Sequence, residues 1–307
     1  MRRTHLSGLD QDLLQRRLVE TGPYARMSRV ESTGSTNADL LAAAAEPKFD
    51  RSWPHLSVLT AEEQTGGRGR LTRHWTSPKG ASLSTSVVLR PSLPVDQWHW
   101  LSLTAGLALV TVLRERGLPA GIKWPNDVHV TGRKIAGILA AVPPQSPEVV
   151  IVGCGINVLL TADELPTPGA TSLLLELERA DRTPPPADSA QAAQLRTELL
   201  SDWLEQFARL ESQIQSRGDI GPITAEITST ISTVGQQVRV ELPDGTAVRG
   251  TALDVENSGA LAVEVTGRRG TQLDPEAGGG EERLWAAVPH PVRETFTAGD
   301  VIHLRQA

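Results

Sequence analysis

The chain has 307 residues, of which 39% are hydrophobic and 21% are charged. This length suits one large and one small domain, and the composition excludes a coiled coil, a collagen-like fibre and a wholly disordered chain. A net charge of -6 argues against a protein that mainly wraps duplex nucleic acid, because phosphate neutralisation needs a basic surface. The single cysteine, Cys154, excludes an internal disulfide and a cysteine-rich metal cage.

The basic start of the chain meets Asp10 and Asp12 before an apolar run of signal-peptide length can develop. The longest uncharged stretch, 97–113, is short for a membrane span. We therefore expect a globular cytoplasmic protein that contacts no membrane.

The first half of the chain alternates between helical and strand-like patterns. The expected elements are a helix at 10–21, a strand at 29–32, a helix at 35–46, strands at 57–60 and 82–89, and a helix at 95–116. Ser35 or Thr36 can cap the second helix, and Gly117 ends the third.

Four short strand-like runs follow, at 121–124, 127–130, 134–142 and 148–156, and their spacing indicates an antiparallel meander. The segment from Asn157 to Ala170 is longer than most connections, which favours a functional or mobile loop. The stretch 189–216 has the apolar spacing of an amphipathic helix.

From about Thr233 the pattern changes to short alternating strands, typical of a small barrel. We place a domain boundary between Gly221 and Thr233. The division is an N-terminal extension at 1–28, a larger domain at 29–228 and a small domain at 229–307. The glycine run 278–280 and its charged neighbours indicate a flexible insertion at about 267–294.

The segment Gln64 to Trp75 intersperses arginines with glycines: Gly66, Gly67, Arg68, Gly69, Arg70 and Arg73. Glycines let backbone N–H groups approach an anion, and guanidinium groups bind carboxylate or phosphate through two hydrogen bonds. The pattern therefore suits an anion-clamping loop. A basic surface loop or a nucleic-acid-binding segment of the RGG kind stays open.

A second cluster surrounds the corner from Lys123 to Asp127. Asn126 and Asp127 between two strands suit a plain turn as well as a catalytic site. Lys134 then opens an apolar strand, where its ammonium group can reach a buried anion or simply be solvated. Gly137 leaves room for a ligand to approach the backbone.

The strand ending in Gly153, Gly155 and Asn157 begins like a dinucleotide-binding fingerprint but lacks its third glycine, because Val158 stands there. We interpret these glycines as close-packing positions and Cys154 as a packed thiol. The histidines lack metal-ligand spacing. His74 lies in the arginine-rich loop, and the other six are expected to be incidental.

Taken in order, five segments resemble the motif set of biotin protein ligases: 34–37, 64–75, 123–127, 133–139 and 153–157. The resemblance implies an α+β fold, in which a mixed, mainly antiparallel sheet of the class II synthetase-like kind carries helices on one face. It also implies an SH3-like C-terminal β-barrel. One departure is Thr72, which replaces a usual glycine of the loop.

That family joins biotin to a lysine in two steps, through biotinyl-5′-AMP, with ATP and Mg²⁺. By resemblance, Arg68, Arg70 and Lys134 stabilise the charge that develops at phosphorus, and Asp127 orients or deprotonates the incoming lysine. The resemblance places the following residues at the biotin and nucleotide sites: Ser35, Thr36, Asn37, Gln64, Gly67, Arg68, Gly69, Arg70, Trp75, Asn126, Lys134, Gly137, Gly155 and Asn157. No resident metal site is expected.

The implied partner is the biotin carboxyl carrier domain of acyl-CoA or pyruvate carboxylases. About 28 residues precede Arg29, too few for the DNA-binding domain of bifunctional members, so no DNA binding is expected. We expect a monomer or weak homodimer. Two alternatives stay open, namely a lipoate ligase or lipoyl transferase, and a non-catalytic biotin sensor.

Overall fold

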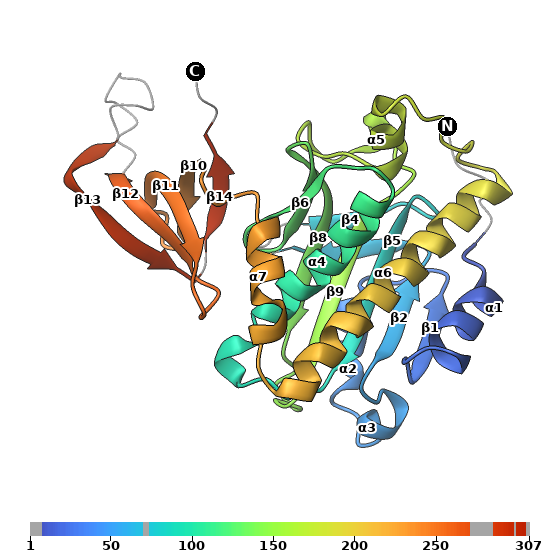
Figure 1. The fold of residues 1–307 in the computed structure, drawn as a ribbon. Helices are drawn as coiled ribbons and strands as arrows, with labels where there is room; N and C mark the ends of the chain where they lie inside the picture. Colours follow the sequence, from blue (N-terminus) through green and yellow to red (C-terminus); the bar gives the residue numbers. More distant parts are fainter. Residues whose placement is uncertain (1–7, 70–73, 271–284, 298, 305–307) are drawn as a thin grey trace.

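The computed structural model describes residues 8–69, 74–270, 285–297 and 299–304. These residues form a large mixed sheet, a smaller antiparallel sheet and a two-stranded hairpin (Figure 1). In the described part of the chain the large sheet has the order β1-β2-β5-β9-β8-β7-β6: β1 Arg26–Val30, β2 Ser57–Ala61, β5 Ser82–Leu89, β6 Ala120–Lys123, β7 Asp127–Val130, β8 Arg133–Ala141 and β9 Val150–Asn157.

Only one pair of neighbouring strands in this sheet, β1 and β2, runs parallel among the residues described. Strands β6 to β9 follow one another as antiparallel neighbours, so the predicted meander is confirmed. The predicted α+β class with a mixed, mainly antiparallel sheet is likewise confirmed.

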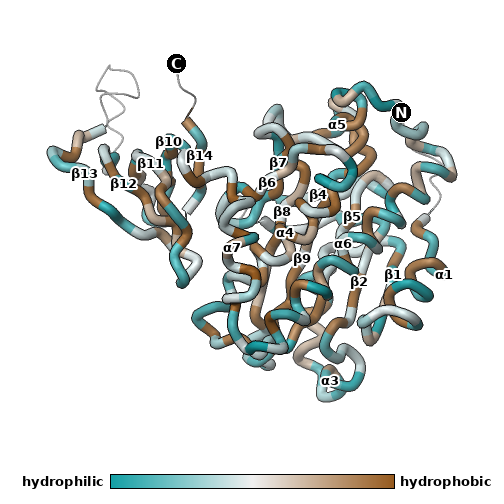
Figure 2. The backbone as a smooth tube through the Cα atoms, in the orientation of Figure 1, coloured by the Kyte–Doolittle hydropathy of each residue, from teal (hydrophilic) through white to brown (hydrophobic). Residues whose placement is uncertain are grey.

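Helices cover both faces of the large sheet. They are α1 Gln11–Leu14, η1 Gln15–Glu20, α2 Thr36–Ala43, α3 Phe49–Ser52, η2 Val95–Gln97, α4 Trp100–Glu115, η3 Ala162–Glu164, α5 Leu173–Arg179, α6 Ala190–Arg217 and α7 Gly221–Thr230. In Figure 1, α4 and α6 cross the front of the sheet. In Figure 2, α6 alternates between hydrophilic and hydrophobic colours, as an amphipathic helix should.

Successive side chains of a strand point to opposite faces of the sheet, so each face has its own hydrophobic core. Val87 of β5 packs in the larger core with α4 and α6, whereas its neighbour Val88 packs with Leu40 of α2 in a smaller core. The helices predicted on one face therefore form the main layer, and α2 and α3 cover part of the other face. In the described part of the chain, no helix is long and apolar enough to cross a membrane.

The N-terminal segment is part of the larger domain rather than an appended extension. Leu14 and Leu18 are fully buried, and Arg17 binds Glu205 of α6 through two hydrogen bonds of 2.9 and 2.7 Å. The predicted division after residue 28 would cut through β1.

The smaller sheet has the order β13-β12-β11-β10-β14 in the described residues: β10 Gln237–Glu241, β11 Ala247–Val255, β12 Leu261–Arg269, β13 Ala286–Phe296 and β14 Asp300–His303. The predicted insertion at 267–294 is wrong at both ends, because β12 reaches Arg269 and β13 begins at Ala286. The residues between, 271–284, lie outside the described part. Helix α7 occupies most of the range Gly221–Thr233 in which the domain boundary is predicted.

Two tryptophans attach the smaller sheet to the larger domain. The indole N–H of Trp100 donates to the carbonyl of Asn257 at 2.8 Å, and that of Trp124 donates to the carbonyl of Gly259 at 2.9 Å. Gly259 has φ 72°, and a β-carbon there would lie 1.8 Å from the His99 ring. These contacts fix the loop before β12 against the corner that carries Trp124.

Candidate active site

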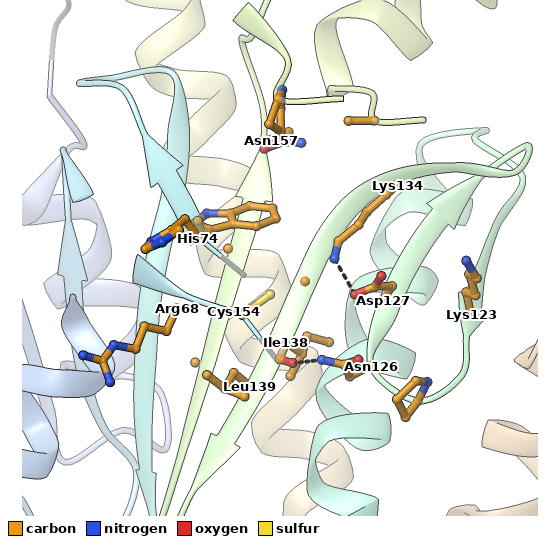
Figure 3. A pocket seen from close by; sticks show the side chains of 18 of the residues that line it. Arg68, His74, Lys123, Asn126, Asp127, Lys134, Ile138, Leu139, Cys154 and Asn157 are labelled. Atoms are coloured by element: carbon orange, nitrogen blue, oxygen red, sulfur yellow. Dashed lines mark hydrogen bonds and ion pairs between the residues drawn. The ribbon is translucent and has the colours of Figure 1, made fainter. Parts of the chain in front are cut away.

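A cavity of about 400 Å³ opens where the hairpin, the β6–β9 meander, the segment 166–170 and strand β14 meet (Figure 3). Most residues that the sequence assigns to the site line it: Ser35, Thr36, Asn37, Gln64, Arg68, Gly69, Trp75, Asn126, Asp127, Lys134, Gly137, Gly155 and Asn157. Gly67 does not line it, and Arg70 lies outside the described residues. Positions far apart in the sequence therefore meet at one site.

The arginine-rich segment is more ordered than a loop, since β3 (Gln64–Arg68) pairs with β4 (His74–Ser77) as an antiparallel hairpin. A β-carbon at Gly67 would lie 2.5 Å from the carbonyl oxygen of Trp75. The requirement for glycine at this position is therefore steric. The segment predicted as a loop therefore contains two strands, and its residues 70–73 lie outside the described part of the chain.

One end of the cavity is a network of small polar groups at the start of α2. Ser35 caps the helix, and the backbone N–H of Thr36 donates to Gln64 Oε1 at 3.0 Å. Asn37 Nδ2 donates to the Leu139 carbonyl at 2.9 Å, while its Oδ1 accepts from Ser86 at 2.7 Å. These groups satisfy one another, and they are of the kind that hydrogen-bonds a polar ring.

The floor of the cavity has few side chains. Gly137 of β8 and Gly155 of β9 are register partners, and the Trp75 ring lies over both. A β-carbon at Gly155 would lie 2.5 Å from the ring nitrogen, whereas one at Gly137 would lie 3.4 Å from the ring edge. Any larger residue at 155 would therefore displace Trp75.

Lys134 and Asp127 form an ion pair on one side of the cavity, with Nζ 2.6 Å from Oδ1. Their side chains are 30% and 20% exposed and point toward each other in Figure 3. The ammonium group also lies 5.7 Å from the centre of the Trp75 ring. Asp127 is thus more than a turn residue, since its carboxylate balances the charge of Lys134.

Asn126 holds the corner in place beneath this pair. Its backbone carbonyl accepts from the N–H of Ile138 at 2.9 Å, and its side-chain amide donates to the Ile138 carbonyl. Asn126 therefore joins the β6–β7 corner to strand β8.

Arg68 lies on the opposite side of the same cavity. Figure 3 shows its guanidinium group pointing away from Lys134, toward the outer side of the hairpin. The two cationic groups therefore share the cavity, yet they do not converge on one point in this structure.

Sequence reasoning missed several lining residues, which include His129 and Asp300, and it gave Lys123 of the 123–127 motif no role of its own. His129 had been expected to be incidental, but it follows Asp127 by two residues on a strand and therefore shares its face. Its Nε2 atom is buried and has no hydrogen-bond partner among the described residues. Burial, reinforced by the charge of Lys123, lowers the pKa of His129 to about 4. The alternation of β7 was the available signal.

Cys154 also lines the cavity, as a buried thiol whose pKa burial raises well above its ordinary value. It matches the predicted packed thiol. Among the described residues, no three His, Cys, Asp or Glu side chains gather as a metal site would require.

Two family models match the chain. The Biotin/lipoate A/B protein ligase family matches residues 30–157, and the Biotin protein ligase C terminal domain matches residues 233–304. The first match contains nearly all the cavity residues that precede the 166–170 segment. The fold and the site thus define a protein of the biotin and lipoate ligase class.

Individual relatives narrow this class. The chain is 37% identical over 305 residues to a biotin–[acetyl-CoA-carboxylase] ligase of Mycobacterium tuberculosis, with 97% of this chain and 96% of that protein covered. A ligase of the same name from Paracoccus denitrificans is 33% identical and covers 80% of this chain and 96% of its own length. The chain therefore belongs to the biotin protein ligase family.

A solved structure has the same fold. A biotin protein ligase from Aquifex aeolicus, in complex with biotin and ATP, superposes with a TM-score of 0.64 at 22% identity, over 92% of this chain and 99% of that one.

Proposed function

We propose that this chain is a ligase that activates biotin with ATP and transfers it to a lysine of a biotin carboxyl carrier domain. The observation that carries the proposal is that one cavity has a polar network at one end and Lys134 and Arg68 on facing sides. Full-length similarity to named biotin–[acetyl-CoA-carboxylase] ligases supports the choice of biotin and ATP as substrates.

In the first step a carboxylate oxygen of biotin bonds to the α-phosphorus of ATP, and the bond to the bridging oxygen of the β-phosphate breaks. The products are biotinyl-5′-AMP and pyrophosphate. Two anions must approach each other, so cationic side chains lower the barrier where negative charge accumulates. Lys134 and Arg68 supply that charge, with Arg70 of the same segment as a further candidate.

Biotin lies at the polar end of the cavity in this proposal. Ser35, Thr36, Asn37 and Gln64 exchange hydrogen bonds among themselves for bonds to its ureido ring, whose polar atoms need partners once buried. Trp75 and Asn157 lie on the nucleotide side, above the floor formed by Gly137 and Gly155.

In the second step the lysine amine of the carrier bonds to the carbonyl carbon of biotinyl-5′-AMP, and AMP leaves. A charged lysine is a poor nucleophile, so it must first lose a proton. Asp127 is bound to Lys134 in this structure. When Lys134 turns to the phosphate, the Asp127 carboxylate becomes available to orient the incoming ammonium group and to accept the proton that it loses.

Mg²⁺ enters this proposal with ATP, as the phosphate complex. The described residues gather no three His, Cys, Asp or Glu side chains, so the proposal assigns the ion to the phosphates of ATP. The residues that line the cavity would then surround a phosphate-bound ion.

We also propose a division between a larger domain that ends at 228 and a small domain at 229–307, supported by the separate matches of the two family models. Monomeric or weakly dimeric assembly, absence of DNA binding and location in the cytoplasm stay predictions from the sequence. The carrier domain of acyl-CoA or pyruvate carboxylases stays the predicted partner.

The test is to incubate the chain with ATP, Mg²⁺ and an acceptor domain, in the presence of biotin or lipoate. We expect biotin-dependent pyrophosphate release and a biotinylated acceptor. Lipoylation without biotinylation would support the lipoate ligase alternative. Biotin binding without pyrophosphate release would support the non-catalytic sensor.

A further inference from the structure

Lys134 is held by its backbone on the edge of β8 opposite β7, beyond Ala136, where the pairing with β9 ends. Its N–H donates to the carbonyl of Gly169 at 2.8 Å, and its carbonyl accepts from the N–H of Thr171 at 2.8 Å. The segment 169–171 thus acts as a short additional strand beside Lys134, with Ala170 as its bridge partner. Gly169 and Ala170 also line the cavity.

The carboxylate of Glu176 in α5 binds both β8 and the segment 169–171. Arg133, the residue before Lys134, donates from Nε and Nη2 to the two Glu176 oxygens, at 2.9 Å each. The hydroxyl of Thr171 donates to the same carboxylate. Glu176 therefore connects the strand that carries Lys134 with the segment that pairs to it.

The Glu176 side chain is 3% exposed, so its charge needs strong partners. Burial opposes its ionisation, but hydrogen bonds from Arg133 and Thr171 outweigh burial and hold the pKa of the carboxyl below its ordinary value. Arg179 adds a further bond of 2.6 Å from the next turn of α5. The group is thus a carboxylate with donors from three residues.

We infer that Glu176 is a positioning residue for Lys134, because its carboxylate fixes the two backbone segments that set where the Lys134 side chain begins. The Lys134 ammonium group can then leave Asp127 while the Cα atom of Lys134 keeps its place. Electrostatic catalysis requires a charge that is placed to within a fraction of an ångström, whereas simple binding tolerates a looser position. This inference rests on the proposed role of Lys134 in adenylate formation.

The experiment compares Glu176→Gln with Glu205→Gln in the full chain. Glu205 is the control for loss of an arginine–carboxylate pair elsewhere in the domain, since it binds Arg17 through two hydrogen bonds, at 2.9 and 2.7 Å, and touches neither Lys134 nor the segment 169–171 in the described residues. We expect Glu176→Gln to lower kcat for biotinyl-5′-AMP formation about tenfold with KM for biotin unchanged. Glu205→Gln, at a side chain that is 39% exposed, should change kcat less than twofold.

A double-mutant cycle then separates positioning from general stability. If Glu176 acts through Lys134, Glu176→Gln should lower kcat by less than about twofold once Lys134 is already replaced, as in Lys134→Arg. A full tenfold loss in that background would overturn the inference, as would a loss equal to that of Glu205→Gln. If Glu176→Gln does not fold, Thr171→Val removes one arm of the same network and takes its place in the cycle.

Failure of the proposed function has a different signature. A wild-type chain that releases no pyrophosphate with biotin and ATP would remove the reaction itself. A wild-type chain that is active, together with a Glu176→Gln variant of full kcat, would remove only the role of Glu176.

Discussion

The strand that carries Lys134 and the hairpin that carries Arg68 face each other across the cavity but are anchored differently. Strand β8 is hydrogen-bonded to β7, to β9 and to the segment 169–171. In the described residues the backbone of the hairpin β3–β4 bonds within itself and, at its base, to Thr33 and Gly34, and only its ends have side-chain bonds to Thr36 and Ser84. We call these the anchored side and the hairpin side.

Burial follows the same division. Ile135 and Ala136 beside Lys134 are fully buried, whereas Thr65, Gly66 and Arg68 of the hairpin are exposed. Segments with few partners open at low free-energy cost, and ligand-closing elements come from such segments. The comparison suggests that the anchored side supplies preorganised charge and that the hairpin side closes over the intermediate.

The largest effect is expected at the charge of the anchored side. Lys134→Ala should lower biotinyl-5′-AMP formation about 1,000-fold, because removal of a preorganised charge at the reacting centre costs several kcal/mol. The melting temperature should change little, since the Lys134 side chain is 30% exposed. Pyrophosphate release and calorimetry measure the two quantities.

Lys79→Ala is the control for that experiment, because Lys79 is an exposed lysine outside the cavity. Equal losses of activity and stability in Lys134→Ala would identify a structural lysine. The anchored side would then not be the catalytic one.

The burial of His129 on the anchored side can be tested through the pH dependence of the unfolding free energy. Its pKa of about 4 in the folded chain lies below its ordinary 6.5, so the unfolded chain binds more protons between these values and stability falls as pH falls through them. This group alone should remove about 2 kcal/mol of unfolding free energy between pH 7 and pH 5. In His129→Gln that part of the loss should disappear.

Urea unfolding at the two pH values measures the difference. His290→Gln, on the exposed strand β13, serves as the control and should keep the wild-type pH dependence. An unchanged pH dependence in His129→Gln would mean that the ring is solvated in the free protein.

The anchored side could be predicted from local sequence, and much of its support could not. The meander has strong strand patterns, and Lys134, Asn126 and Asp127 sit at its turns and strand starts. Glu176, by contrast, meets Arg133 across 43 residues of sequence, and nothing local marks the pair. Contacts of that range depend on how whole elements dock.

Two errors in the C-terminal half have similar causes. Helix α7 is rich in threonine and isoleucine, which favour strands, but Ile223 and Ile227 lie one turn apart and are both fully buried against the larger core. Strand β13 carries Pro289 and Pro291 and is largely exposed, so it lacks an apolar alternation. Its order comes from pairing with β12.

The hairpin side should show a smaller effect on chemistry and a clearer effect on retention of the intermediate. Arg68→Gly removes an exposed cation from the closing segment, so biotinyl-5′-AMP should escape about tenfold more often before transfer. Released intermediate acylates bystander lysines. Labelling of an added unrelated protein, detected with streptavidin, measures the escape, and unaltered acceptor selectivity would argue against closure by the hairpin.

Replacement of Asp127 is expected to have the smallest effect, because its carboxylate holds Lys134 before the first step and binds the acceptor amine in the second. Asp127→Asn keeps the shape of the corner but removes the charge that receives the acceptor ammonium group, while Lys134 keeps its own charge for the first step. Transfer to the acceptor should therefore fall about fivefold more than adenylate formation. Single-turnover measurements with preformed biotinyl-5′-AMP isolate the second step. Equal losses in both steps would mean that Asp127 only holds Lys134, and the anchored side would then act in adenylation alone.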